Sequence, residues 1–155
     1  EYSKILLNWS IKNNYQFINA SSASVYGLGK NGFKESHKSE SPINPYAFSK
    51  LFFDKYIRKI ITKCDSQVVS LRYFNVYGPR ENHKKKMAST IYHFHHQIKN
   101  EKTCNLFEGY DDYKSGEQKR DFVYVEDCAD VNLWFMNNPS KSGIFNVGTG
   151  FSLQT

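Results

Sequence analysis

Apolar and polar residues alternate along this 155-residue chain in blocks whose spacing changes from helical to extended. The pattern predicts helices over 2–14, 45–63 and 87–99, and strands over 16–21 and 67–74. The second of these strands, QVVSLRYF, is apolar and β-rich, which is typical of a buried strand. Helices that alternate with strands favour an α/β fold built on a parallel sheet.

The last third of the chain is less regular. Residues 105–120 are polar and predict loops, and DFVYVEDCADVNLWFMNN predicts a short strand and then a helix that starts near Glu126 or Asp127. SGIFNVGTG predicts one more strand with a glycine-rich exit, where glycine permits turns or a close backbone approach. The residues that we expect this last helix to bury are Ala129, Val131, Leu133, Trp134 and Phe135.

NPYAFSKLFFDKY, residues 44–56, has the signature of a helix start. Asn44 suits the N-cap and Pro45 the first helical position. Tyr46 and Lys50 then lie one turn apart on the same side of the helix. Two interpretations stay open: a tyrosine packed over a lysine stem, or a phenol whose ionised form is stabilised by an ammonium group. The apolar stripe of this helix is expected at Leu51, Phe52, Tyr56 and Ile60.

Three segments can bring a hydroxyl, a phenol and an ammonium group to one edge of the sheet. Ser22 closes the strand in ASSASVYG, Tyr46 and Lys50 follow, and RYFNVYGPR (72–80) closes the next strand. Open α/β sheets bind their ligands at the carboxyl ends of the strands. A free tyrosine titrates near pH ~10, so a neighbouring lysine helps it to exchange protons at neutral pH. Such a set can remove a hydroxyl proton while hydride leaves the same carbon. Taken alone, Ser22 is also explained as a cap at the strand end.

The charge and the cysteines restrict the possible partners. The formal net charge is +6, which favours anionic partners, although 17 of the 21 basic residues are lysine and a general drift toward lysine explains the charge as well. The lysines are spread along the chain and the aromatic residues lie at core spacings, so we expect no nucleic-acid partner. Three distant cysteines without a CxxC pair indicate a reducing compartment, the cytoplasm. No apolar run is long enough for a membrane span.

SSASVYG, YAFSK and RYFNVYGPR, in this order and at these spacings, resemble the extended short-chain dehydrogenase/reductase superfamily. YxxxK alone is a weak signal, whereas the ordered set is specific. GPRENHKKKMAS, LFEG, KRDFVYVEDCADVNLWF and SGIFNVGTG narrow the resemblance to the ADP-glycero-manno-heptose 6-epimerase family of lipopolysaccharide core synthesis, over nearly the whole chain. The resemblance implies an isomerase that uses bound NADP, acts on an ADP-heptose sugar nucleotide and forms homo-oligomers.

The family's motifs also imply roles for individual residues. Ser22 matches an active-site serine, Tyr46 the catalytic tyrosine and Lys50 the catalytic, cofactor-binding lysine. Lys84 matches a second acid/base that also contacts the cofactor. The family needs two such groups because epimerisation at C6 removes a hydride from one face of the sugar and returns it to the other. Val76 matches a cofactor contact, and the substrate contacts, besides Ser22, correspond to Asn75, His93, Phe107, Glu108, Gly109, Tyr110 and Arg120. Arginine suits a pyrophosphate, although Arg120 alone is also explained by a structural ion pair.

The chain departs from the family pattern at three places. Lys85 and Lys86 stand where the family has small residues, and their charge either repels Lys84 or is solvated. The segment 110–120 is longer than expected, and Tyr110 replaces a smaller residue. No GxxGxxG phosphate-binding turn is present. We therefore expect a C-terminal part of a longer protein, and a non-catalytic chain is one alternative.

The expected organisation is a partial Rossmann-type parallel sheet plus part of a smaller substrate domain. Residues 1–76 would form the later part of the dinucleotide-binding domain, 77–120 mainly the substrate domain, and 121–155 would return to both. HFHH (93–96) is not expected to hold a metal, because adjacent histidines on a helix point in different directions. The other functional alternative is a different sugar-nucleotide epimerase or dehydratase, such as a relative of UDP-galactose 4-epimerase.

Overall fold

The computed structural model describes residues 1–109 and 113–154. It divides into two compact units. Unit 1 contains Glu1–Tyr73 and Asp130–Val147, and unit 2 contains Phe74–Ala129 and Gly148–Thr155.

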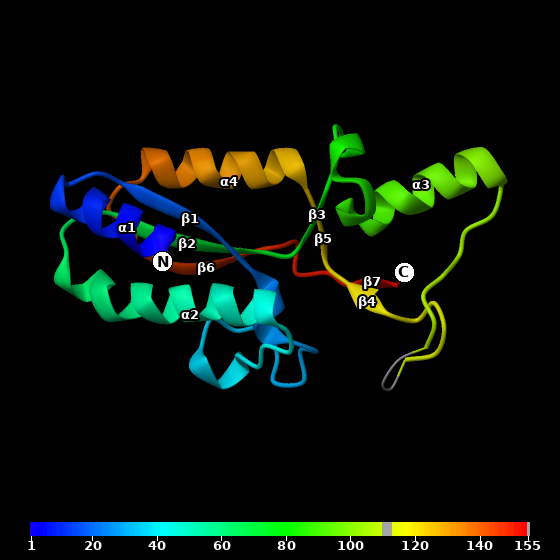
Figure 1. Ribbon diagram of the computed structural model, residues 1–155, viewed down its shortest axis with the longest axis horizontal. Coiled ribbons are helices and arrows are strands. Elements are labelled where there is room, and N and C mark those ends of the chain that lie inside the picture. Colours follow the sequence, from blue (N-terminus) through cyan, green and yellow to red (C-terminus); the bar gives the residue numbers. More distant parts are fainter. Residues whose placement is uncertain (110–112, 155) are drawn as a thin grey trace. The chain divides into compact units, whose positions relative to one another are not determined.

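A three-stranded parallel sheet forms the centre of unit 1 (Figure 1). The strand order is β1 (Phe17–Ser22), β2 (Val68–Tyr73) and β6 (Gly143–Val147), with β2 in the middle. Because all three strands run in parallel, their carboxyl ends share one edge, where Ser22 pairs with Tyr73 and Tyr73 with Val147. The α/β class and the parallel sheet that the sequence predicts are thereby confirmed.

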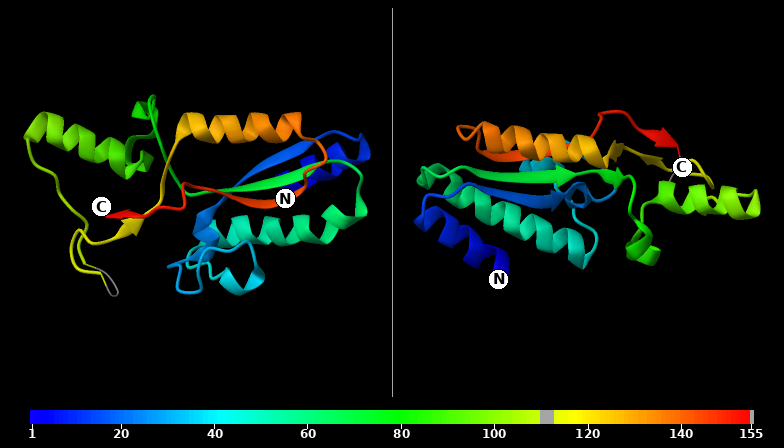
Figure 2. Two further views of the ribbon diagram at one scale, coloured as in Figure 1. Left: turned by 180° about the vertical axis from the view of Figure 1, so that it is seen from behind. Right: turned by 90° about the horizontal axis from the view of Figure 1, so that it is seen from above.

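Helices cover both faces of this sheet. α1 (Tyr2–Lys12) and α2 (Pro45–Ile60) lie on one face, and the part of α4 (Val125–Asn137) that belongs to unit 1 lies on the other (Figure 2). On the first face Leu7, Ile57 and Val68 form a fully buried cluster. The short 3-10 helices of this unit are η1 (Ala23–Tyr26), η2 (His37–Ser39) and η3 (Ile61–Lys63).

The predicted helices exist, but two buried faces differ from the prediction. In α2 the buried residues are Ala47, Leu51, Asp54 and Ile57, while Phe52 is exposed. In α4 Leu133 and Trp134 are 53% and 49% exposed. Ala129 is exposed and Val131 half-buried, whereas Phe135 is buried as expected and packs on Phe145 of β6. The buried face of α4 is the face that packs on the sheet, and the hydrophobic pattern alone predicted a different face.

Unit 2 contains two small two-stranded sheets and a helix. β3 (Asn75–Tyr77) pairs in parallel with β5 (Phe122–Tyr124), and β4 (Lys119–Arg120) pairs antiparallel with β7 (Leu153–Gln154). α3 spans Thr90–Glu101 and follows the 3-10 segment η4 (Asn82–Met87). The predicted helix 87–99 begins later because the Ser89 side chain accepts a hydrogen bond from the Tyr92 N–H and caps α3.

Among the described helices, none has the length and apolar character needed to cross a bilayer. Among the described residues, no disulfide joins Cys64, Cys104 or Cys128.

Candidate active site

Ser22 ends β1 at the carboxyl edge of the sheet. Its side-chain oxygen accepts a hydrogen bond from the Ser24 N–H at 3.2 Å, which caps η1. The capping role and a position at the ligand-binding edge are therefore combined in one residue. The hydroxyl proton of Ser22 is not used by this cap, so it is free to be donated to a ligand oxygen.

Tyr46 and Lys50 lie in the first two turns of α2. Asn44 caps this helix by accepting from the Ala47 N–H at 2.9 Å, and Pro45 occupies the first position, as predicted. The Lys50 Nζ lies 5.7 Å from the centre of the Tyr46 ring and donates to the Ala20 carbonyl at 2.7 Å. Tyr46 is 57% exposed, so its hydroxyl is open to a ligand.

This contact to Ala20 links the helix to the strand that carries Ser22. Ala20 lies two residues before Ser22 on β1, so one lysine side chain holds the start of α2 against the end of β1. The structure thus brings Tyr46, Lys50 and the strand end of Ser22 together within unit 1.

A buried network of charged residues lies in the same unit and was not found from the sequence. Arg72 of β2 is fully buried and donates to Asp54 at 2.8 Å, to Glu40 at 2.5 Å and to the Tyr26 hydroxyl at 3.0 Å. Asp54 of α2 is also fully buried and accepts from the hydroxyls of Ser21 and Ser70. The network therefore joins α2, β1 and β2 near the residues predicted to be catalytic.

The electrostatics of this network stabilise its charged forms. Burial raises the pKa of Glu40, but hydrogen bonds from Arg58 and Arg72 outweigh burial and hold the pKa below its ordinary value. Burial lowers the pKa of Arg72, but its bonds to Glu40, Tyr26 and Asp54 raise it overall. Burial raises the pKa of Tyr26. Arg72 and Glu40 therefore form an ionised pair at neutral pH.

The loop after η1 contains glycines at the spacing GxGxxG, at Gly27, Gly29 and Gly32. A dinucleotide-binding turn of this pattern opens a helix directly after a strand. Here the glycines lie in turns, and the next regular element is η2. Gly27 has a φ of 59°, and a Cβ there would lie 2.0 Å from the Ser41 carbonyl oxygen. These glycines therefore allow the turns of this loop and do not form a dinucleotide-binding turn.

Asn75 and Val76 of unit 2 lie on β3. The Asn75 backbone N–H and side-chain amide both donate to the Asp121 carbonyl, at 3.0 and 3.1 Å, so its amide nitrogen fixes β3 to the segment before β5. The carboxylate of Asp121 in turn accepts from Thr149 and from the Gly150 N–H. Asp121 organises the glycine-rich exit of β6, a role that the sequence pattern did not indicate.

Arg120 and Phe107 lie together in unit 2. The Arg120 guanidinium stands 5.2 Å from the centre of the Phe107 ring. Among the described residues its Nε has no hydrogen-bond partner, although the atom is buried. The guanidinium group can bind an anionic ligand, and this role of Arg120 stays a prediction.

Two of the remaining predicted substrate contacts, Glu108 and Gly109, form hydrogen bonds within the loop 105–118. The Glu108 carbonyl accepts from Gln118, and the Gly109 N–H donates to the Ser115 hydroxyl. His93 lies half-buried on α3. Tyr110 lies outside the described residues.

Lys84 is held by a carboxylate. It lies in η4, is 43% exposed, and its Nζ stands 3.4 Å from Glu81. Lys85 and Lys86 are exposed, which favours a solvated charge over a contact with Lys84. Lys85 has a φ of 50° and a ψ of −124°, a backbone conformation that residues other than glycine rarely adopt.

We expect Lys85→Gly to stabilise the protein. The backbone conformation of Lys85 costs about 1–3 kcal/mol, and glycine avoids this cost but adds about 0.5–1 kcal/mol of chain entropy on folding. The net gain should be about 1 kcal/mol, measured by urea unfolding. Lys86→Gly is the matched control, and it should lose stability. Equal losses in both variants would contradict the strain argument.

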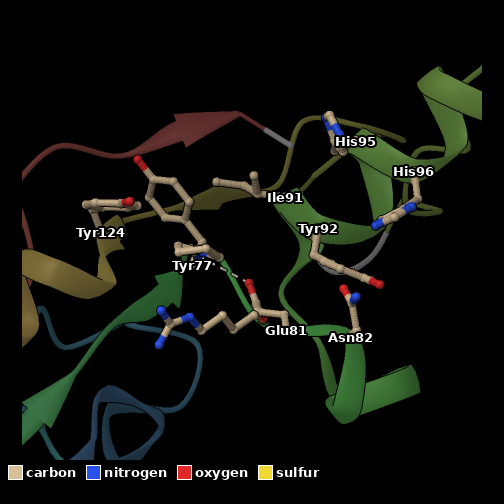
Figure 3. A pocket seen from close by; sticks show the side chains of 11 residues that line it. Tyr77, Glu81, Asn82, Ile91, Tyr92, His95, His96 and Tyr124 are labelled. Carbon is tan, nitrogen blue, oxygen red and sulfur yellow. Dashed lines mark hydrogen bonds between the residues drawn. The ribbon is translucent and has the colours of Figure 1, made fainter.

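A pocket of about 370 Å³ lies in unit 2, between β3, η4, α3 and β5 (Figure 3). Its walls are largely aromatic: the rings of Tyr77 and Tyr124 lie 5.5 Å apart and those of Tyr92 and His96 lie 4.3 Å apart. Glu81 also lines the pocket. None of the residues that the sequence predicts as contacts is among those that line it, so this pocket was not anticipated.

Comparison with known proteins gives the same family as the motifs. The chain is 52% identical over 149 residues to the ADP-L-glycero-D-manno-heptose-6-epimerase of Thiobacillus denitrificans. The aligned region covers 96% of this chain and 45% of that protein. The corresponding Helicobacter pylori enzyme superposes with a TM-score of 0.83 at 40% identity, over 96% of this chain and 45% of that one. The UDP-N-acetylglucosamine 4-epimerase of Methanobrevibacter ruminantium gives 0.81 at 31% identity, over 98% of this chain and 47% of that one.

The chain thus spans about 45% of the length of the curated relative that it matches. The model of the NAD-dependent epimerase/dehydratase family matches residues 1–148, which is nearly the whole chain and includes Ser22, Tyr46, Lys50 and Lys84. The chain therefore belongs to the NAD-dependent epimerase/dehydratase family.

Proposed function

We propose that the full-length protein epimerises the heptose of ADP-glycero-manno-heptose at C6, for lipopolysaccharide core synthesis. The observation that carries this proposal is the 52% identity to an ADP-heptose epimerase, together with the arrangement of Tyr46 and Lys50 beside the strand of Ser22. The 31% identity to a UDP-sugar 4-epimerase supports a second candidate, epimerisation of another nucleotide sugar.

The donor groups of unit 1 fit a nicotinamide nucleotide, which we propose to be NADP. A lysine ammonium has three N–H donors, and one of those of Lys50 goes to the Ala20 carbonyl. The others suit ribose hydroxyls, and the exposed Tyr46 hydroxyl suits the reacting oxygen. The chemistry that the bound nicotinamide supplies is the reversible acceptance of a hydride from C6. Val76 and Lys84 are proposed as further cofactor contacts.

The residues of the chain would move the protons. Tyr46 exchanges a proton with the oxygen on C6, while the Lys50 charge stabilises the phenolate and Ser22 donates a hydrogen bond to the same oxygen. Lys84 is the proposed acid/base for the opposite orientation of the sugar. The proposed substrate contacts, Ser22 apart, are Asn75, His93, Phe107, Glu108, Gly109, Tyr110 and Arg120.

We assign NADP mainly to unit 1 and the contacts with the sugar nucleotide mainly to unit 2. We also propose that the protein is cytoplasmic. We also propose a homo-oligomer, because α1 exposes an apolar face made of Tyr2, Ile5 and Trp9. Sedimentation of the full-length protein tests the oligomer, and a monomer would contradict it.

The function is tested by incubating the full-length protein with ADP-D-glycero-D-manno-heptose and following the C6 epimer by NMR. Conversion to a mixture of epimers without net reduction of the added NADP is expected. UDP-galactose and UDP-N-acetylglucosamine serve as competing substrates. Conversion of either in preference to the heptose would overturn the proposal and support the second candidate.

A further inference from the structure

Glu81 is a buried carboxylate to which the proposed function gives no role. It is 3% exposed and lies just before η4. One oxygen accepts from the Ser89 hydroxyl at 2.7 Å. The same oxygen accepts from the Gly78 N–H at 3.3 Å (Figure 3). The other accepts from the Ser89 N–H at 2.8 Å and pairs with Lys84 at 3.4 Å.

Through these four contacts, the Glu81 side chain fixes the segment 78–89. Gly78 follows β3, and Ser89 caps α3, so Glu81 joins the end of a strand to the start of a helix. The segment between them carries Lys84. A loop that is fixed at both ends by one carboxylate holds its middle residue in a narrow range of positions.

The charge of Glu81 is maintained by the same contacts. Burial raises its pKa, but the hydrogen bonds from Ser89 and Gly78 and the charge of Lys84 outweigh burial and keep the pKa below its ordinary value. The other titratable groups on the surrounding elements are mostly cationic or neutral: Arg80, His83, Lys85 and Lys86 on the segment, Tyr92, His93, His95, His96 and Lys99 on α3, and Tyr77 and Tyr124 on β3 and β5. The exception is Glu101, the last residue of α3. Of the carboxylates in the described residues, Glu81 is the one that pairs with Lys84.

We propose that Glu81 is the positioning residue of Lys84: its buried carboxylate fixes the segment 78–89 and orients the Lys84 amine through their contact at 3.4 Å. The inference rests on the proposed function, in which Lys84 is an acid/base. A structural role alone would require the bonds to Ser89 and Gly78 but not the contact with the ammonium group. The experiment must therefore separate the loop anchor from the charge.

Competitive acylation of the full-length protein at neutral pH, read by mass spectrometry, measures the nucleophilicity of each lysine. An amine held against a carboxylate is less available to the reagent than a solvated amine, so Lys84 should react several-fold more slowly than its exposed neighbours Lys85 and Lys86, which are internal controls in the same segment. Glu81→Gln should remove most of this difference. Ser89→Ala weakens the loop anchor but keeps the charge, and it should retain the difference.

Equal reactivity of the three lysines in the wild type would overturn the inference, even if Glu81→Gln does not fold. A loss of the difference in Ser89→Ala that matches Glu81→Gln would assign the effect to the loop and would also overturn it. Acylation requires no turnover, so its result is independent of the proposed function, which fails only if the wild type does not epimerise ADP-heptose. In an active protein, Glu81→Gln should lower kcat about tenfold and leave KM within about twofold, as expected for a misplaced acid/base.

Discussion

Replacing Tyr46 by phenylalanine in the full-length protein is expected to lower turnover of ADP-heptose by about 10²- to 10⁴-fold, the range typical for loss of a general acid/base. The variant keeps the ring that lies beside Lys50 and loses only the exposed hydroxyl. The Lys50 bond to Ala20 does not involve that hydroxyl, so binding of the nucleotide should persist. Turnover is measured by NMR of the C6 epimers, and nucleotide binding by fluorescence titration with NADPH.

Tyr56→Phe is the matched control, because Tyr56 lies on the same helix and its hydroxyl donates to Asn8 of α1 at 2.9 Å. It removes the same atom about three turns away and should leave turnover within about twofold. Near-normal turnover in Tyr46→Phe would contradict the assignment of the phenol as the proton-exchanging group. Loss of both turnover and NADPH binding would instead indicate a role in holding the nucleotide.

Local signals in the sequence predicted the elements that carry this site. Asn44 and Pro45 fix the start of α2 by capping and by a preset φ, which neighbouring residues alone determine. The strand at 17–22 and the strand at 68–73 were found within one residue, because runs of apolar residues specify buried strands. The predicted start of α2 and the predicted strand that contains Ala20 together bring Lys50 close to Ala20.

Interactions between distant residues were not predictable in the same way. Leu133 and Trp134 are exposed although both are large and apolar, since the buried face depends on which side of the helix meets β6. The lysine run before α3 belongs to η4, because Ser89 caps the helix and Glu81 holds Ser89. A single glutamate in the sequence gives no sign of such a contact. The charged cluster of Arg72, Asp54 and Glu40 was missed for the same reason.

Arg72→Met is expected to lower the free energy of unfolding by about 3–5 kcal/mol, because it removes the ion-pair partner of the buried Asp54 and leaves Glu40 with Arg58 alone. Such a loss is a large part of the total stability of an ordinary domain, about 5–15 kcal/mol. Urea unfolding of the full-length protein measures it. Arg58→Met is the control: Arg58 also pairs with Glu40 but is 21% exposed, so its removal should cost about 1 kcal/mol.

The difference between wild type and Arg72→Met should also depend on pH in a defined direction. The pKa of Glu40 lies below its ordinary value of 4.5 in the folded protein, so the carboxylate contributes stability that is present above that pH and is lost as the pH falls through the folded pKa. Unfolding curves at neutral pH and at pH ~3 should therefore show a smaller gap between the two proteins in acid. A gap that stays constant would mean that the lost packing of the Arg72 side chain, and not its charge, stabilises the edge of the sheet where Ser22 lies.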